Sequence, residues 1–194
     1  MRIPTYLIAL AAATLQGLPA ASFAASPAAP PAAFHRVEIK PPGQGKPLPY
    51  TLEVPQDWQV RQVAGYPGLW IGPADAKPPE DARLIWVRGS QVSLAKPDEV
   101  VANIKANDAK EADWTAPRAE VREVGGVRGV LWQMDSGEGD AARSTLTLKL
   151  PLANLAADFV ASAKRSEFPK MLPLYERILL SARPVAADTA GKKP

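Results

Sequence analysis

Hydrophobic side chains in the middle of the chain recur at every second position, the spacing that places them on one face of a β-strand. Within residues 144–152 all leucines fall on one face, while Thr145, Thr147 and Lys149 fall on the other. We therefore expect an antiparallel β-sheet of about six to eight strands. The pattern predicts strands at 34–40, 48–54, 68–72, 83–88, 119–124, 127–134, 144–150 and 159–164.

Two of these segments carry additional information about the sheet. Residues 83–88 are apolar at consecutive positions, which is typical of a central strand covered on both faces. The segment 54–60, VPQDWQV, ends the second strand, and we expect Trp58 to fill the end of the sheet there. Trp86 and Trp132 lie inside strands, so we expect both in the core.

A helical pattern closes the chain. Hydrophobic residues follow a period near 3.6 and form one stripe made of Phe168, Met171, Leu172, Tyr175, Ile178, Leu179 and Ala182. Pro173 has no N–H to donate to the carbonyl of Pro169, so we expect an irregular first turn at 168–172 and a regular helix from Pro173 to about Ala182. A shorter, weaker helix is expected from Pro97 to about Lys110, with Asp98 and Glu99 in its first turn.

The predicted elements combine into an α+β fold. Gly125 and Gly126 separate two strands, and glycines tolerate the positive φ that a tight hairpin turn requires. One helix is inserted between strands and one ends the folded region, and we expect both to pack on the sheet. The folded region is expected to be a single domain at 34–184.

The N-terminus has the pattern of a secretory signal peptide. Arg2 precedes a short uncharged apolar run, and Ser22-Phe23-Ala24 places the cleavage site near Ala24. A retained membrane anchor is the alternative, but the run is shorter than the ~20 apolar residues that a span needs. We expect residues 1–24 to be a signal peptide, 25–33 a Pro/Ala-rich linker and 185–194 a disordered tail, with the mature protein in a bacterial periplasm and without a transmembrane segment.

Composition argues against nucleic acid as a partner. The chain has 23 Lys and Arg against 20 Asp and Glu, and removal of residues 1–24 removes only Arg2 from this count. The remaining net charge, 22 − 20 = +2, is matched by Lys192 and Lys193 in the tail, so the folded region is close to neutral. The chain has no cysteine, so its stability depends on packing without disulfides.

The sequence contains no convincing catalytic motif. Ser93 and Lys96 match an S-x-x-K pattern, but Pro97 disfavours a helical conformation at Lys96 and the partner motifs are absent. His35 is the only histidine and is best explained as a half-buried or linker residue. We expect no enzyme activity, no cofactor and no metal site, although the acidic loop Asp135–Asp140 leaves ion binding open. A second acidic loop contains Asp75, Glu80 and Asp81.

Aromatic residues supply the candidate binding residues. Tyr66 and Trp70 lie in GYPGLW and Trp114 lies in ADWTAPR, where we expect loops. Exposed aromatic side chains on loops can anchor a partner or a ligand. The alternative is that they cover the ends of the fold. Tyr66, Trp70 and Trp114 are therefore the predicted partner-binding or ligand-binding residues.

Three motifs together resemble the PsbP-like superfamily. They are the strand exit VPQDW, the Gly-Gly hairpin and the closing segment FPKMLPLYERILLSAR, and the resemblance spans about residues 48–183. This superfamily includes an extrinsic photosystem II subunit and bacterial periplasmic DcrB-like proteins. The resemblance implies an α/β/α sandwich built on an antiparallel sheet, and binding or assembly functions without catalysis. It supplies no catalytic residues.

Three functions are compatible with the sequence. The first is an exported, non-enzymatic protein that binds a protein or another component of the bacterial envelope. The alternative is a carrier for a small ligand or lipophile, with a pocket between the sheet and the helix at 168–182. A hydrolase built on Asp, Glu and Ser residues is the third. The identity of the partner or ligand and the oligomeric state are not encoded in any motif found here.

Overall fold

The computed structural model describes residues 33–39, 48–79, 81–90, 94–108, 110, 113–152 and 155–185. The predicted signal peptide and nearly all of the linker and tail lie outside these residues, as do Glu80 and Ser93. The described part contains ten β-strands, two α-helices and a short 3-10 helix. In chain order these are β1 (Phe34–Glu38), β2 (Tyr50–Pro55), β3 (Trp58–Arg61), β4 (Leu69–Pro73), β5 (Ile85–Ser90), α1 (Pro97–Asp108), β6 (Trp114–Val124), β7 (Val127–Ser136), η1 (Gly139–Ala141), β8 (Arg143–Leu152), β9 (Leu155–Lys164), α2 (Phe168–Leu180) and β10 (Arg183–Pro184).

The strands form two antiparallel sheets. The larger has seven strands in the order β3-β4-β5-β9-β8-β7-β6, and the smaller has three in the order β1-β2-β10. The α+β class is confirmed, with the strands divided between two sheets where one was expected. Trp58 is buried in the core just beyond the end of β2, and it also begins β3, so it starts the larger sheet immediately after β2 has ended the smaller one.

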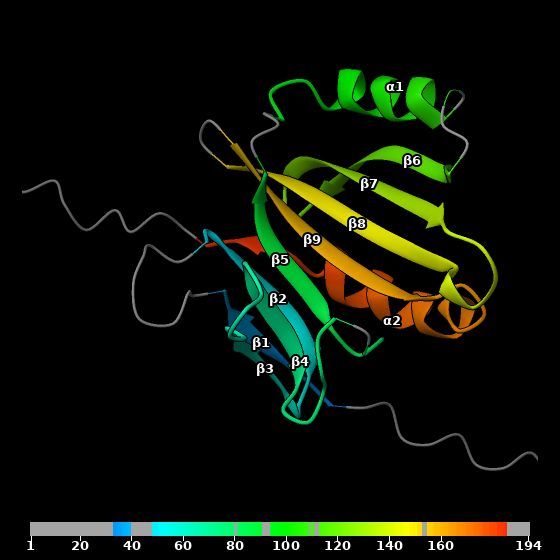
Figure 1. Ribbon diagram of the computed structural model, residues 1–194. Coiled ribbons are helices and arrows are strands. Elements are labelled where there is room, and N and C mark those ends of the chain that lie inside the picture. Colours follow the sequence, from blue (N-terminus) through cyan, green and yellow to red (C-terminus); the bar gives the residue numbers. More distant parts are fainter. Residues whose placement is uncertain are drawn as a thin grey trace, which may run out of the picture. The chain divides into compact units, whose positions relative to one another are not determined.

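The two α-helices lie on opposite faces of the seven-stranded sheet, as Figure 1 shows. Helix α2 packs on β8 and β9 and also contacts β2 of the smaller sheet. The main core lies on this side, where β8 contributes Leu146, Leu148 and Leu150 and α2 contributes Tyr175 and Ile178, all fully buried. This arrangement follows from the alternation in β8, which directs every leucine between 146 and 150 to the side covered by α2.

Helix α1 covers one end of the other face. It contacts β6 and β7, and its half-buried residues Val100, Val101 and Ile104 pack beside Leu94 and Val130. Asp98 and Glu99 lie in its first turn, as predicted, where the helix dipole favours negative charge. From β7 the same face of the sheet continues over β8, β9, β5 and β4.

Helix α2 is one continuous helix from Phe168 to Leu180, so the irregular first turn expected at 168–172 was wrong. Pro169 lies in the first turn, where an N–H would have no intrahelical acceptor in any case. Pro173 removes one hydrogen bond to the Pro169 carbonyl, but both prolines are exposed and water can bond that carbonyl. The buried side chains before and after Pro173 hold the helix on the sheet.

The Gly-Gly hairpin between β6 and β7 forms as predicted. Gly125 and Gly126 have φ angles of 61° and 82°, the left-handed values of a two-residue primed turn. A Cβ atom at Gly125 would lie 2.6 Å from the carbonyl oxygen of Ala182 and 2.9 Å from Cδ of Pro184. Glycine at 125 therefore allows the hairpin to approach the segment that leads from α2 into β10.

Candidate binding site

A transverse row of side chains crosses the face of the seven-stranded sheet that α2 does not cover. Trp70 pairs in register with Trp86, Trp86 with Val160, Val160 with Thr147, and Thr147 with Trp132. Directly paired residues point to the same face of a sheet, so these side chains stand side by side on β4, β5, β9, β8 and β7. We call these five residues the tryptophan row.

A cavity of about 660 Å³ lies over the tryptophan row. All five residues of the row line it, together with Leu84 and Met134. This volume falls within the range of about 300–1,000 Å³ that is usual for small-molecule sites. The lining is mainly apolar, so the cavity can hold an apolar group with its surface removed from water.

Aromatic contacts build one side of this cavity. The rings of Trp70 and Trp86 are stacked, with centroids 5.9 Å apart and an interplanar angle of 16°. The Tyr66 ring meets Trp70 edge-on at 6.0 Å. Trp86 Nε1 donates a hydrogen bond to the Pro67 carbonyl at 2.6 Å, which fixes that indole. Trp70 Nε1 is buried and has no acceptor among the described residues.

An ion pair is buried beside the tryptophan row, two residues further along β8 and β9. Lys149 Nζ donates to Asp158 Oδ1 at 2.5 Å and to Ser90 Oγ at 2.8 Å. Lys149 and Asp158 are only 5% and 3% exposed, and they are direct partners across β8 and β9. Arg88, which lines the cavity, places its guanidinium 4.6 Å from the Trp86 ring centroid and its Nε 3.5 Å from Asp158 Oδ2.

At the other end of the cavity three polar side chains meet. Arg143 Nε donates to Ser162 Oγ at 3.2 Å, and the Thr145 hydroxyl lies 3.1 Å from the same oxygen. Thr145 and Ser162 are direct partners in register, and all three residues line the cavity. We call these three residues the Arg143 corner.

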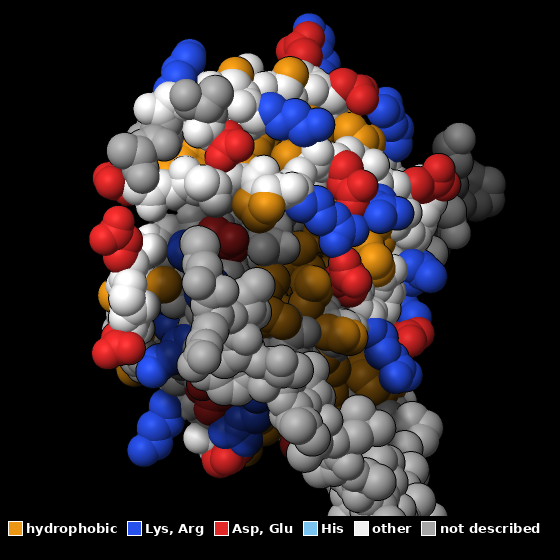
Figure 2. Space-filling model, turned by 90° about the vertical axis from the view of Figure 1, so that its right-hand side faces the viewer, with side chains coloured by type: hydrophobic (Ala, Val, Ile, Leu, Met, Phe, Trp, Pro, Cys, Tyr) orange, Lys and Arg blue, Asp and Glu red, His pale blue; other side chains and the backbone are white. Residues whose placement is uncertain are grey.

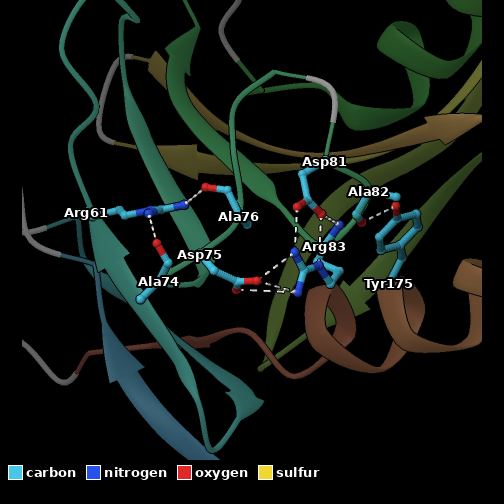
Figure 3. A network of polar contacts seen from close by, with 8 residues as sticks. All are labelled: Arg61, Ala74, Asp75, Ala76, Asp81, Ala82, Arg83 and Tyr175. Carbon is cyan, nitrogen blue, oxygen red and sulfur yellow. Dashed lines mark hydrogen bonds and ion pairs between the residues drawn. The ribbon is translucent and has the colours of Figure 1, made fainter.

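A charged loop between β4 and β5 forms part of the rim. Figure 3 shows Arg83 between Asp75 and Asp81, with Arg83 Nη2 at 3.2 Å from Asp75 Oδ2 and 2.8 Å from Asp81 Oδ2. Hydrogen bonding by Arg83 lowers the pKa of Asp81, so this cavity-lining carboxylate stays ionised and paired. In the same view the Tyr175 hydroxyl donates to the Ala82 carbonyl at 2.6 Å, which ties the loop to α2.

Burial at Tyr175 also has an electrostatic consequence. The side chain lies in the core beneath the loop, and desolvation raises its pKa well above the ordinary value. The phenol is therefore neutral throughout the physiological range and acts as a hydrogen-bond donor between α2 and the loop.

Comparison with known proteins identifies the fold. No family model and no curated protein matches this chain. Among solved structures it is similar to the cyanobacterial PsbP protein CyanoP of Synechocystis, with 15% identity, a TM-score of 0.51 and coverage of 84% of this chain and 98% of CyanoP. It is also similar to LpqN of Mycobacterium tuberculosis, with 14% identity, a TM-score of 0.52 and coverage of 77% and 90%. The chain has a PsbP-like fold.

In the PsbP-like domain the three predicted binding residues lie in two different places. Tyr66, 38% exposed, and the buried Trp70 lie together beside the cavity. Trp114 lines a different cavity of about 410 Å³, together with Asp135, Glu138 and Arg165 among others. The strand expected at 68–72 forms as β4 and contains Trp70, so Trp70 does not lie on a loop. Trp114 was also expected in a loop, but it begins β6, which starts five residues before the strand predicted at 119–124.

In the PsbP-like domain the cavity lies on a different face of the sheet from the predicted pocket. The inward side chains of α2, Phe168, Tyr175, Ile178 and Leu179, are at most 3% exposed and belong to the packed core. The 660 Å³ cavity lies on the opposite face and takes none of its lining from α2. The expected pocket between the sheet and the C-terminal helix is therefore replaced by the cavity over the tryptophan row.

Sequence reasoning missed most of the cavity. Trp86 and Trp132, expected in the core, are half-buried and line the cavity. One signal was available: in 83–88 the alternate residues Leu84, Trp86 and Arg88 share a face, separate from Ile85 and Val87. A face that combines tryptophan with arginine is more suited to a binding surface than to a closed core.

The polar side chains of the cavity offer hydrogen-bonding and ionic groups to a ligand. In the cavity, Ser162 contacts Arg143 and Thr145, neither of which can act as a general base. No three His, Asp or Glu side chains within the described ranges are arranged to hold a metal ion. His35 is half-buried in β1. Asp135, expected in the acidic loop, lies in β7 and accepts a hydrogen bond from Gln133 at 3.2 Å.

Proposed function

We propose that this protein is an exported, non-enzymatic binding protein of the bacterial envelope, and that it binds a small apolar or amphipathic ligand over the tryptophan row. The observation that carries the proposal is the 660 Å³ cavity with three tryptophans in its lining. Tryptophan offers a large rigid surface that loses little conformational entropy on binding. The tight packing of the other face beneath α2 makes this face the better candidate for a ligand.

Two observations support the envelope as its location. The N-terminal pattern is that of a signal peptide with cleavage near Ala24. LpqN, which shares the fold, is described as involved in cell envelope biogenesis. No helix in the described part of the chain is long and apolar enough to cross a membrane.

Export is tested by expressing the full chain with a C-terminal tag in a Gram-negative host. We expect the tagged protein in the osmotic-shock fraction, with an N-terminus at Ala25, give or take one residue, by intact mass and N-terminal sequencing. The matched control is Leu10→Arg, which interrupts the apolar run and should leave the uncut chain in the cytoplasm. Recovery of the unsubstituted chain in the cytoplasm with Met1 intact would contradict export.

Ligand binding is tested with N-phenyl-1-naphthylamine, a neutral apolar fluorophore whose emission rises and shifts to the blue in an apolar site. We expect saturable binding that Val160→Trp weakens at least tenfold, because the indole would occupy the cavity over the centre of the row. The control is Leu155→Trp, on the same strand but 47% exposed and outside the lining. Circular dichroism confirms that both variants fold. Equal binding by all three proteins would place the fluorophore elsewhere and contradict the proposal.

A further inference from the structure

The hydrogen bonds within the Arg143 corner leave one hydroxyl hydrogen and two hydroxyl lone pairs without a protein partner among the described residues. A hydroxyl has one hydrogen to donate and two lone pairs to accept. Arg143 Nε donates to Ser162 Oγ, and one of the two hydroxyls donates to the other. Whichever way the Thr145–Ser162 pair is oriented, one hydroxyl hydrogen remains, and these side chains have no other hydrogen-bond partner within the described part of the chain.

The charge at this corner is also uncompensated. Arg143 has no carboxylate partner among the described residues, and its bond to the neutral Ser162 leaves the terminal N–H groups of its guanidinium available. Lys164, which pairs with Arg143 in register and is exposed, adds a second positive charge at this end of the face. A guanidinium with free terminal N–H groups matches the geometry of a carboxylate or a phosphate.

The other charged groups in the cavity lining are already paired. Asp81 is bound by Arg83 on the rim loop. Arg88, at the opposite end, lies 3.5 Å from Asp158 and stacks on Trp86. A negative charge on a ligand would therefore be stabilised most at the Arg143 corner. There it would meet a cation that has no carboxylate beside it among the described residues.

The corner adjoins the apolar part of the cavity. Ser162 is two residues from Val160 on β9, and Thr145 is two residues from Thr147 on β8, so the corner lies roughly 7 Å from the tryptophan row. The row itself crosses five strands and spans roughly 19 Å at the usual strand spacing. A ligand with one polar end and an elongated apolar body fits this arrangement.

We infer that the ligand is an anionic amphiphile, whose single carboxylate or phosphate group is bound by the Arg143 corner while its apolar body lies over Trp86, Val160 and Trp132. The inference rests on the proposed function, because it takes the cavity as the binding site. A free fatty acid and a phospholipid still in its bilayer share this chemistry, and the experiment separates them.

The test is isothermal titration calorimetry of the exported protein with decanoate and with decanol, which have the same chain length and differ in headgroup charge. Both are used below their aggregation and solubility limits. We expect decanoate to bind at least tenfold more tightly than decanol, as a charge-assisted hydrogen bond would give. Arg143→Met removes the charge and keeps the stem, and it should bring the two affinities close to equal.

Two further variants keep the test decisive. Ser162→Ala removes one hydroxyl without touching the charge and should weaken decanoate binding about threefold to tenfold, even if Arg143→Met folds poorly. Arg122→Met replaces an arginine of β6 outside the cavity lining and should leave the decanoate affinity unchanged.

Sedimentation with phosphatidylcholine vesicles, with and without phosphatidylglycerol, tests the bilayer source. Arg143-dependent binding only to the anionic vesicles would assign the ligand to a membrane lipid.

The outcomes distinguish this inference from the function on which it rests. Equal affinities for decanoate and decanol in the unsubstituted protein, both lost in Val160→Trp, would overturn the anionic ligand and retain the cavity as a binding site. Absence of binding by either compound and by the naphthylamine probe would overturn both. A preference for decanoate that survives Arg143→Met would overturn the assigned corner.

Discussion

Replacing Asp158 with alanine is expected to lower the free energy of unfolding by about 3–5 kcal/mol, the usual cost of removing one partner of a buried ion pair. Asp158 and Lys149 are 3% and 5% exposed and are held together across β8 and β9. Without the carboxylate, the Lys149 ammonium would stay buried, with Ser90 as its one side-chain hydrogen-bond acceptor among the described residues. Arg88 would add a second positive charge nearby. Urea denaturation of the purified protein measures the change.

The control for Asp158→Ala is a carboxylate in an exposed ion pair. Asp98 pairs with Arg128 at 3.0 Å, but its side chain is 72% exposed, so Asp98→Ala should cost no more than about 1 kcal/mol. The double substitution of Lys149 by Met and Asp158 by Leu removes both charges and should recover most of the loss. A cost below about 1 kcal/mol for Asp158→Ala would mean that water reaches the pair.

The second large effect is expected at Ile178 in α2. This side chain is fully buried between the helix and the sheet, so Ile178→Ala removes apolar contacts and leaves a cavity, at a cost of about 2–5 kcal/mol. Lys170→Ala, on the exposed side of the same helix, should change the free energy of unfolding by no more than about 0.5 kcal/mol. Equal effects of the two substitutions in urea denaturation would contradict the packing of α2 on the sheet.

Local patterns in the sequence were sufficient for the fold class. Period-2 alternation located the strands, and the stripe from Phe168 to Ala182 located the C-terminal helix, because burial on one face imposes these periods directly. The Gly-Gly turn was equally local, since it depends only on the φ angles that its two residues can adopt. Pro173 was misjudged because the local rule omits the burial of Tyr175 and Ile178, which holds the helix in place.

The binding cavity could not be predicted from the same patterns. The tryptophan row depends on β5 pairing with β9, and no local pattern carries that partnership between distant segments. Lys149 was correctly placed opposite the leucines of β8, but the alternation alone does not indicate whether that face is covered. The structure buries it with Asp158, which lies on a strand whose position beside β8 and β5 only the complete sheet defines.

The place of β9 in the sheet also sets the order in which the chain can fold. β9 lies between β5 and β8, so the β3-β4-β5 segment joins the rest of the larger sheet only through residues 155–164. Pairing between segments so far apart in the chain requires a long loop to close before the contacts form, which slows folding. A chain that is still being synthesised has no β9 to join these parts, so its sheet stays open. For a protein that is exported as proposed, closure of the larger sheet only after residues 155–164 are made favours passage through a membrane before folding is complete.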